Sequence, residues 1–244
     1  MQVFTETLSA DGAVTLTAYL QVDSPDIPNY HTRPAVLIFP GGAYRVLCER
    51  EGEPIALSFL AQGYHAFVLH YSIGEGKRFE DPLRDGETAL RLIRSHAEEW
   101  RVIPDQIAVC GFSAGGHLAA AMGTVAQERA NALVLCYPCI LESMSALFPF
   151  TAPSLDKAVD KDTPPTFLFH TRDDDAVPVE NPQRFAAALD RAGVPFELHI
   201  FASGRHGLAL ANRQTSCGCD GLMSRSVSHW FPLCCDWLEQ VFHL

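Results

Sequence analysis

The stretch IAVCGFSAGGHLA, residues 107–119, decides the fold of this chain. Residues 107–110 form a short apolar run typical of a buried strand, and the turn at 111–115 follows directly. The small residues at 117–126 then favour a helix. The turn matches G-x-S-x-G, a pattern that presents a serine where a strand turns sharply into a helix. Ser113 is therefore the candidate nucleophile.

The glycines of this turn have a physical reason. The serine at such a turn has unfavourable backbone angles, and side chains on either side of it would collide with the neighbouring backbone. Ser113 would lie at the N-terminal end of a helix, whose partial positive charge favours a developing oxyanion. The alternative is an ordinary glycine-rich turn with a helix-capping serine. The preceding strand, the following helix and the candidate partners farther along the chain favour a catalytic role.

Outward from this turn, apolar runs alternate with helical patterns along the chain. The apolar runs predict strands at 13–22, 35–39, 65–71, 107–110, 132–137, 166–170 and 196–201, and the helical patterns predict helices at 53–62, 85–100, 117–126, 181–191 and 226–242. Continuous apolar strands separated by helices are typical of a parallel sheet covered on both faces. We therefore predict a doubly wound α/β fold with a mostly parallel sheet. A length of 244 residues fits one domain, 1–244, in which 140–165 forms a short lid.

A serine hydroxyl is a weak nucleophile at neutral pH, so Ser113 needs a base, and the base needs a carboxylate to orient it. In the order Ser, Asp, His, the acid and the base follow later strands of such a sheet. Asp173, Asp174 and Asp175 follow the run TFLFH, and His206 follows the run FELHIF. Both groups would lie beyond strand carboxyl ends, where open α/β sheets place their ligands. The other histidines that lie in or at strands are more typical of packing; they are His65, His70, His170 and His199.

A second motif lies at the end of the strand predicted at 35–39. The stretch FPGGAY, residues 39–44, is similar to the HGGG motif, whose backbone N–H groups bind a substrate oxyanion. Small residues there allow the substrate carbonyl to approach the main chain. We expect the amide of Ala114, with that of Gly42 or Ala43, to form this oxyanion hole. A simple strand-to-loop turn is the alternative. Tyr44 and His117 are candidate substrate contacts beside the two motifs.

At this point the chain resembles a known family. The segments IFPGGAY, REGEPIA, FVLHYS, IAVCGFSAGGHLA, PPTFLFHTRDDDAVPVEN and ELHIFASGRHGLALA resemble the small bacterial α/β-hydrolases of the acetyl esterase and acetyl xylan esterase-like group, related to the prolyl oligopeptidase and hormone-sensitive-lipase branches. The resemblance implies the α/β-hydrolase fold and hydrolysis of carboxylic esters, often acetylated sugars or xylo-oligosaccharides, without a metal or cofactor. The segment from Asp174 to Pro178 resembles the family's D-x-x-V-P turn, which implies that Asp174 is the acid. Ala43 departs from the family pattern, where glycine is commoner.

Composition limits the partners. The net charge of −11 repels phosphate backbones and anionic membranes, so we expect neither nucleic acid nor a membrane as a partner. No secretory signal precedes the first strand, which favours the cytoplasm. The eight cysteines include the close pairs Cys217/Cys219 and Cys234/Cys235, whose spacing is not that of structural zinc sites. We expect free thiols, with metal binding or redox chemistry as the alternatives.

The segment at 140–165 limits the size of the substrate. About two dozen residues make a short cover rather than a lid domain, which favours short acyl chains such as acetate. The stretch LFPF, residues 147–150, would form an apolar wall or pack in the core. Two other classes remain as alternatives: a serine peptidase of the prolyl oligopeptidase type, and a hydrolase-like protein that binds its ligand without catalysis.

Overall fold

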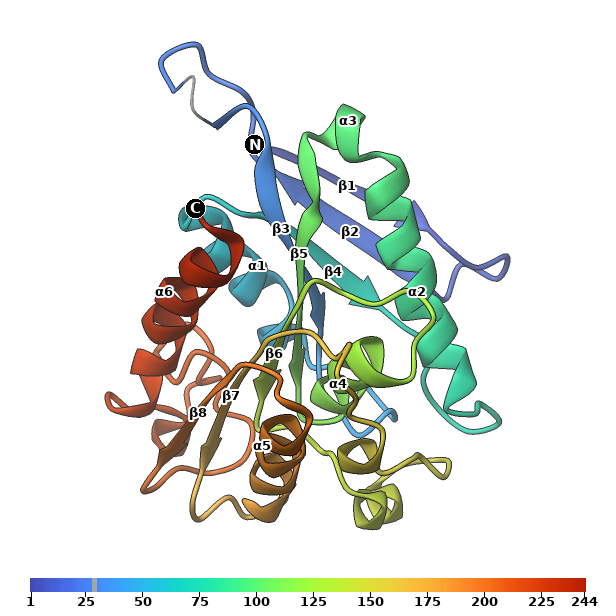
Figure 1. Cartoon of the computed structure of the whole chain (residues 1–244), viewed down its shortest axis with the longest axis vertical. Coiled ribbons are helices and arrows are strands. Elements are labelled where there is room, and N and C mark those ends of the chain that lie inside the picture. The colour runs from blue at the N-terminus through green and yellow to red at the C-terminus, as the bar shows by residue number, and fades with distance from the viewer. Residues whose placement is uncertain (28–29) are drawn as a thin grey trace.

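A computed structural model describes residues 1–27 and 30–244. Its centre is one eight-stranded sheet with the order β1-β2-β4-β3-β5-β6-β7-β8 (Figure 1). The strands are β1 (Gln2–Thr7), β2 (Thr15–Leu20), β3 (Arg33–Phe39), β4 (His65–His70), β5 (Val102–Phe112), β6 (Ala132–Cys136), β7 (Thr166–Thr171) and β8 (Phe196–Phe201). The six strands β3 to β8 pair in parallel. β1 and β2 extend the sheet beyond β4 as antiparallel strands. The predicted α/β class and the mostly parallel sheet are confirmed.

Helices cover both faces of the sheet. They are α1 (Glu53–Ala61), α2 (Glu80–Ser95), α3 (Ala97–Trp100), α4 (Ala114–Thr124), α5 (Glu180–Ala192) and α6 (Trp230–Phe242). One apolar core lies between the sheet and α1 and α6, and a second lies between the sheet and the helices on the opposite face, α2 to α5. Because both faces are buried, β3 and β6 consist entirely of buried residues, as the continuous apolar runs indicate.

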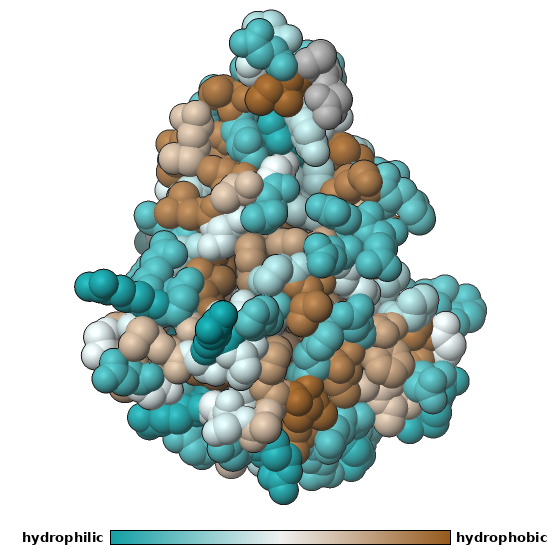
Figure 2. Space-filling view, turned by 90° about the vertical axis from the view of Figure 1, so that its left-hand side faces the viewer, coloured by the Kyte–Doolittle hydropathy of each residue, from teal (hydrophilic) through white to brown (hydrophobic). Residues whose placement is uncertain are grey.

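The outer surface is mixed. Figure 2 shows the side of the molecule that carries α6, where hydrophobic residues lie in small patches between hydrophilic ones. Among the described residues, every helix falls short of the length and apolar character that a bilayer-spanning segment requires.

Several boundaries differ from the sequence predictions. The helix predicted at 85–100 begins earlier, at Glu80, because Pro82 is compatible with a first helical turn, and it is interrupted at His96 before α3. The last helix begins at Trp230 rather than at residue 226, with Pro232 in its first turn. Strand β1 was not predicted, because most of its side chains are exposed and its apolar pattern is weak. Between β6 and β7 the chain forms two short 3-10 helices, η3 (Glu142–Leu147) and η4 (Leu155–Lys157).

Candidate active site

Ser113 lies at a strained turn between β5 and α4. Its φ of 54° and ψ of −116° are unusual for a residue other than glycine and cost about 1–3 kcal/mol. The flanking glycines are required by close packing. A Cβ on Gly111 would lie 2.1 Å from the carbonyl oxygen of Gly115, and one on Gly115 would lie 2.1 Å from that of Phe39. The turn therefore holds the Ser113 hydroxyl at the carboxyl end of the central strand.

A chain of two hydrogen bonds runs from Ser113 through His206 to Asp174. The Nε2 atom of His206 lies 2.8 Å from the Ser113 Oγ atom, and its Nδ1 atom lies 2.8 Å from Asp174 Oδ2. The other carboxylate oxygen of Asp174 accepts hydrogen bonds from the amides of Ala176 and Val177, at 2.9 and 2.8 Å. The turn after β7 thus fixes the carboxylate, and the carboxylate fixes the orientation of the imidazole.

The electrostatics of Asp174 favour its ionised form. Its side chain is only 1% exposed. Burial raises the pKa of the carboxyl, but the hydrogen bond and charge of His206, with the two amides, outweigh burial and leave the pKa below its usual value. An ionised Asp174 accepts a hydrogen bond from the Nδ1–H group of His206, which leaves Nε2 as the acceptor facing Ser113.

The neighbouring aspartates hold the loop that carries His206. Asp173 accepts hydrogen bonds from the hydroxyl of Ser203, at 2.8 Å, and from the amide of Gly204, at 2.7 Å. Asp175 accepts one from the main-chain amide of His206, at 3.0 Å. The run of three aspartates in the sequence therefore divides into one contact with the imidazole and contacts that anchor its loop.

The loop after β3 lines the same cleft as Ser113 with Gly42 and Ala43. Gly42 has a φ of +128°, and a Cβ there would lie 2.1 Å from the Val46 carbonyl oxygen, so this position requires glycine. Ala43 also has a positive φ, of 54°. Within the part of the chain that the structure describes, the amides of Gly42, Ala43 and Ala114 donate no hydrogen bond to protein groups. These are the three amides that the sequence assigns to an oxyanion hole.

Tyr44 and His117 do not line the cleft, contrary to the sequence prediction. Both side chains are fully buried, and the Tyr44 hydroxyl lies 3.1 Å from Nδ1 of His117. The Nε2 atom of His117 lies 3.0 Å from the carbonyl oxygen of Pro153. Burial lowers the pKa of His117 to about 4, which keeps the ring neutral near pH 7. The two residues therefore support the segment at 140–165 and the loop at 40–44, named the oxyanion loop after its predicted role, from inside the core.

A cleft of about 540 Å³ opens in front of Ser113 and His206. Its floor and rim are mainly small or apolar, and include Ala43, Val46 and Leu147. Arg45 joins the oxyanion loop to the segment at 140–165 by donating hydrogen bonds to the carbonyl oxygens of Leu147 and Phe148, at 3.1 and 3.2 Å. Leu147 of this segment thus forms part of one side of the cleft. The role of 140–165 as a short lid remains a prediction.

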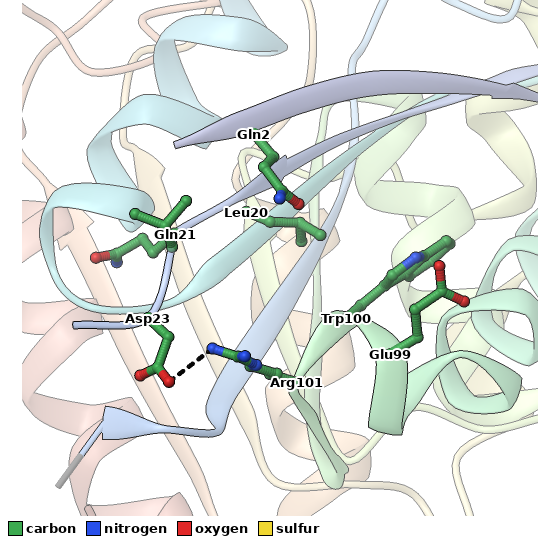
Figure 3. A pocket seen from close by; sticks show the side chains of 8 residues that line it. Gln2, Leu20, Gln21, Asp23, Glu99, Trp100 and Arg101 are labelled. Atoms are coloured by element: carbon green, nitrogen blue, oxygen red, sulfur yellow. Dashed lines mark ion pairs between the residues drawn. The ribbon is translucent and has the colours of Figure 1, made fainter. Parts of the chain in front are cut away.

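A second hollow, of about 270 Å³, lies at the opposite end of the sheet (Figure 3). Gln21, Glu99 and Trp100 line it, and Asp23 pairs with Arg101 across it at 2.9 Å. Arg101 offsets the charge of Asp23, and the hollow lies at the amino ends of the parallel strands, away from Ser113. The cleft at Ser113 is therefore the candidate active site.

All eight cysteines are unbonded in the structure. In the regions described, no three His, Cys, Asp or Glu side chains are grouped so as to hold a metal ion. Cys139 was not singled out in the sequence, yet its Sγ atom lies 3.9 Å from Ser113 Oγ. Burial raises the pKa of Cys139 to about 12, so it remains a neutral thiol beside the candidate nucleophile.

The sheet and its Ser, His and Asp side chains define the class of α/β-hydrolases, and comparison with known proteins agrees. The BD-FAE family matches residues 25–142. The structure of MGS-M1, an α/β-hydrolase enzyme from a Medee basin deep-sea metagenome library, superposes with a TM-score of 0.94 and 45% identity, covering 100% of this chain and 99% of that one. The acetyl ester-xyloside bifunctional hydrolase of Caldicellulosiruptor lactoaceticus gives a TM-score of 0.80 and 37% identity, covering 94% and 88%.

Sequence relatives point the same way. The acetylxylan esterase of Xylanibacter ruminicola is 30% identical over 226 residues, which are 84% of this chain and 45% of that enzyme. The chain spans about a third to a half of the length of three curated relatives that it matches. The chain belongs to the α/β-hydrolase family of bacterial esterases, and the resemblance stated from its sequence is confirmed.

Proposed function

We propose that the chain is a serine carboxylesterase in which Ser113 is the nucleophile, His206 the general base and Asp174 the residue that orients it. The observation that carries the proposal is the hydrogen-bonded chain of these three side chains, with both links at 2.8 Å. It lies beside the free amides of Gly42, Ala43 and Ala114. An activated hydroxyl beside convergent N–H donors is the arrangement that acyl transfer needs.

The reaction proceeds in two steps. His206 takes the proton of Ser113 as the serine oxygen attacks the ester carbonyl, and the oxyanion is stabilised by the backbone amides of Gly42 or Ala43 and Ala114. Collapse of this intermediate expels the alcohol, which takes the proton from His206, and leaves an acyl group on Ser113. Water then attacks the acyl-enzyme with His206 again as the base, and the acid leaves.

The substrate is a short-chain ester, most simply the acetyl ester of a sugar or a xylo-oligosaccharide. The similar proteins named for acetylxylan and acetyl ester-xyloside hydrolysis support this choice. The structure supports a short acyl group, because the buried Cys139 thiol lies 3.9 Å from the Ser113 hydroxyl and limits the space behind it. The apolar residues Val46 and Leu147 lie on the side of the cleft that faces solvent.

A panel of p-nitrophenyl esters and an acetylated xylo-oligosaccharide tests this function. We expect kcat/KM to be highest for the acetyl ester and about 10- to 100-fold lower for the octanoyl ester, since forcing a long chain into a filled space costs about 1–3 kcal/mol. Acetate release from the oligosaccharide, measured directly, tests the alcohol side. More efficient turnover of octanoyl than of acetyl esters would contradict the short-chain assignment. A protein silent on every ester but active on a peptide amide would instead support the peptidase.

A further inference from the structure

A buried carboxylate contacts the oxyanion loop at the edge of the candidate cleft. Glu51 is in the 3-10 turn η2 (Glu49–Glu51) and is only 2% exposed. One of its oxygens accepts a hydrogen bond from the amide of Gly41, at 2.8 Å, and the other accepts one from the hydroxyl of Tyr137, at 2.7 Å. One oxygen of Glu51 therefore contacts the loop after β3, and the other contacts the segment after β6.

Tyr137 extends this contact to the loop that carries the base. Its hydroxyl accepts a hydrogen bond from the amide of Ala209, at 2.9 Å, three residues after His206. Its ring also packs edge to face against the His206 imidazole, with centroids 5.1 Å apart. Burial and then the charge of Glu51 raise the pKa of Tyr137 well above its usual value, so the phenol keeps its proton and donates a hydrogen bond to Glu51.

We propose that Glu51 is a positioning residue for the reaction. Through its contacts with Gly41 and Tyr137 it holds the oxyanion amides at a fixed position relative to the imidazole of His206. The inference rests on the proposed esterase function. It assigns to Glu51 no contact with the substrate and no proton transfer.

The packing around Gly41 explains why its amide controls the loop. A Cβ on Gly41 would lie 2.7 Å from both the Glu51 carboxylate and the Phe112 carbonyl oxygen, and 3.1 Å from the Ser113 Cβ atom. Gly41 is thus pressed against the turn of the nucleophile. Gly42 and Ala43 follow directly, and both have positive φ angles. Because their peptide groups are bonded to Gly41, a rotation of the Gly41 backbone redirects their amides.

Only a carboxylate satisfies both contacts at once. A glutamine at position 51 has one acceptor oxygen and one NH₂ donor. With the NH₂ group toward Gly41, two donors face each other. With the NH₂ group toward Tyr137, the phenol oxygen receives donors from both sides, and its own hydrogen loses its acceptor. Either arrangement leaves a buried polar group without a partner, which favours a shift of the loop.

The test compares E51Q with wild type and with E49Q, a matched control in the same turn whose side chain is exposed. With p-nitrophenyl acetate we expect kcat to fall about 100-fold in E51Q, with KM changed less than about threefold, because misplaced oxyanion donors affect the transition state most. Affinity for phenylboronic acid, which adds to the serine as a tetrahedral anion, should fall by a similar factor. We expect E49Q to match wild type in all three measurements.

A merely structural role for Glu51 predicts a lower Tm, with kcat per folded molecule and boronate affinity unchanged. That result overturns the inference, and so does a kcat of E51Q within about threefold of wild type.

If E51Q does not fold, Y137F serves instead. This variant keeps the aromatic ring against His206 and removes the hydroxyl group. It should lower kcat about tenfold, with the same loss of boronate affinity. A wild-type kcat in Y137F overturns the inference. Wild-type protein without ester turnover would overturn the proposed function itself, whereas an active E51Q overturns only the role of Glu51.

Discussion

Replacing Ser113 with alanine is expected to lower kcat for p-nitrophenyl acetate by about 10⁴- to 10⁶-fold, because loss of a triad nucleophile typically costs several orders of magnitude. Alanine keeps the small volume that the turn between Gly111 and Gly115 demands, so the fold should be retained. The free amides of the oxyanion loop remain in place and account for whatever turnover persists. The measurement is initial-rate hydrolysis of the acetyl ester by the purified variant.

The matched control is Ser95→Ala, which removes an exposed hydroxyl at the end of α2. It should retain wild-type turnover, and both variants should unfold at a temperature close to that of wild type. A Ser113→Ala protein that keeps more than a few per cent of wild-type kcat would show that another group attacks the ester. Cys139 would then be the first candidate, since its thiol lies 3.9 Å away.

Replacing Asp174 with asparagine is expected to lower kcat by about 10³- to 10⁴-fold while leaving the fold intact. The structure predicts how the amide orients. The oxygen that accepts the amides of Ala176 and Val177 must remain an acceptor, so the NH₂ group of asparagine faces Nδ1 of His206. The imidazole then carries its proton on Nε2, where it can no longer accept the proton of Ser113. Initial rates with the acetyl ester across pH 5–9 measure the loss.

Asp173→Asn is the informative comparison for this prediction. Asp173 anchors Ser203 and Gly204 but does not contact the imidazole, so the substitution should cost at most about tenfold, the equivalent of one weakened hydrogen bond. Equal losses in the two variants would mean that Asp174 acts only by holding the loop. A larger loss in Asp173→Asn would reassign the acid.

The sequence predicts the parts of this molecule that depend on short-range pattern. Continuous apolar runs predict buried parallel strands, and the order of Ser113, Asp174 and His206 places each residue after a strand that ends at the same edge of the sheet. The structure brings these three side chains into one hydrogen-bonded chain. Their catalytic role remains a prediction.

Other features depend on contacts between distant segments and leave little trace in the sequence. Glu51 and Tyr137 are 86 positions apart, and a glutamate within the stretch REGEPIA carries no signal that it is buried. Tyr44 and His117 lie beside motifs that form the cleft, so their position suggested substrate contact. The sequence could not show that they turn away from the cleft and pair with each other in the core.

Labelling with a fluorophosphonate tests the esterase assignment most directly. The reagent forms a phosphorus–oxygen bond to an activated serine and releases fluoride, and mass spectrometry of the digested protein locates the adduct. The account predicts one adduct per chain, on the peptide that contains Ser113, with loss of ester hydrolysis in proportion to labelling and no adduct in Ser113→Ala or after prior binding of phenylboronic acid. An adduct on another residue, or full ester turnover by a protein that takes up no label, would contradict it.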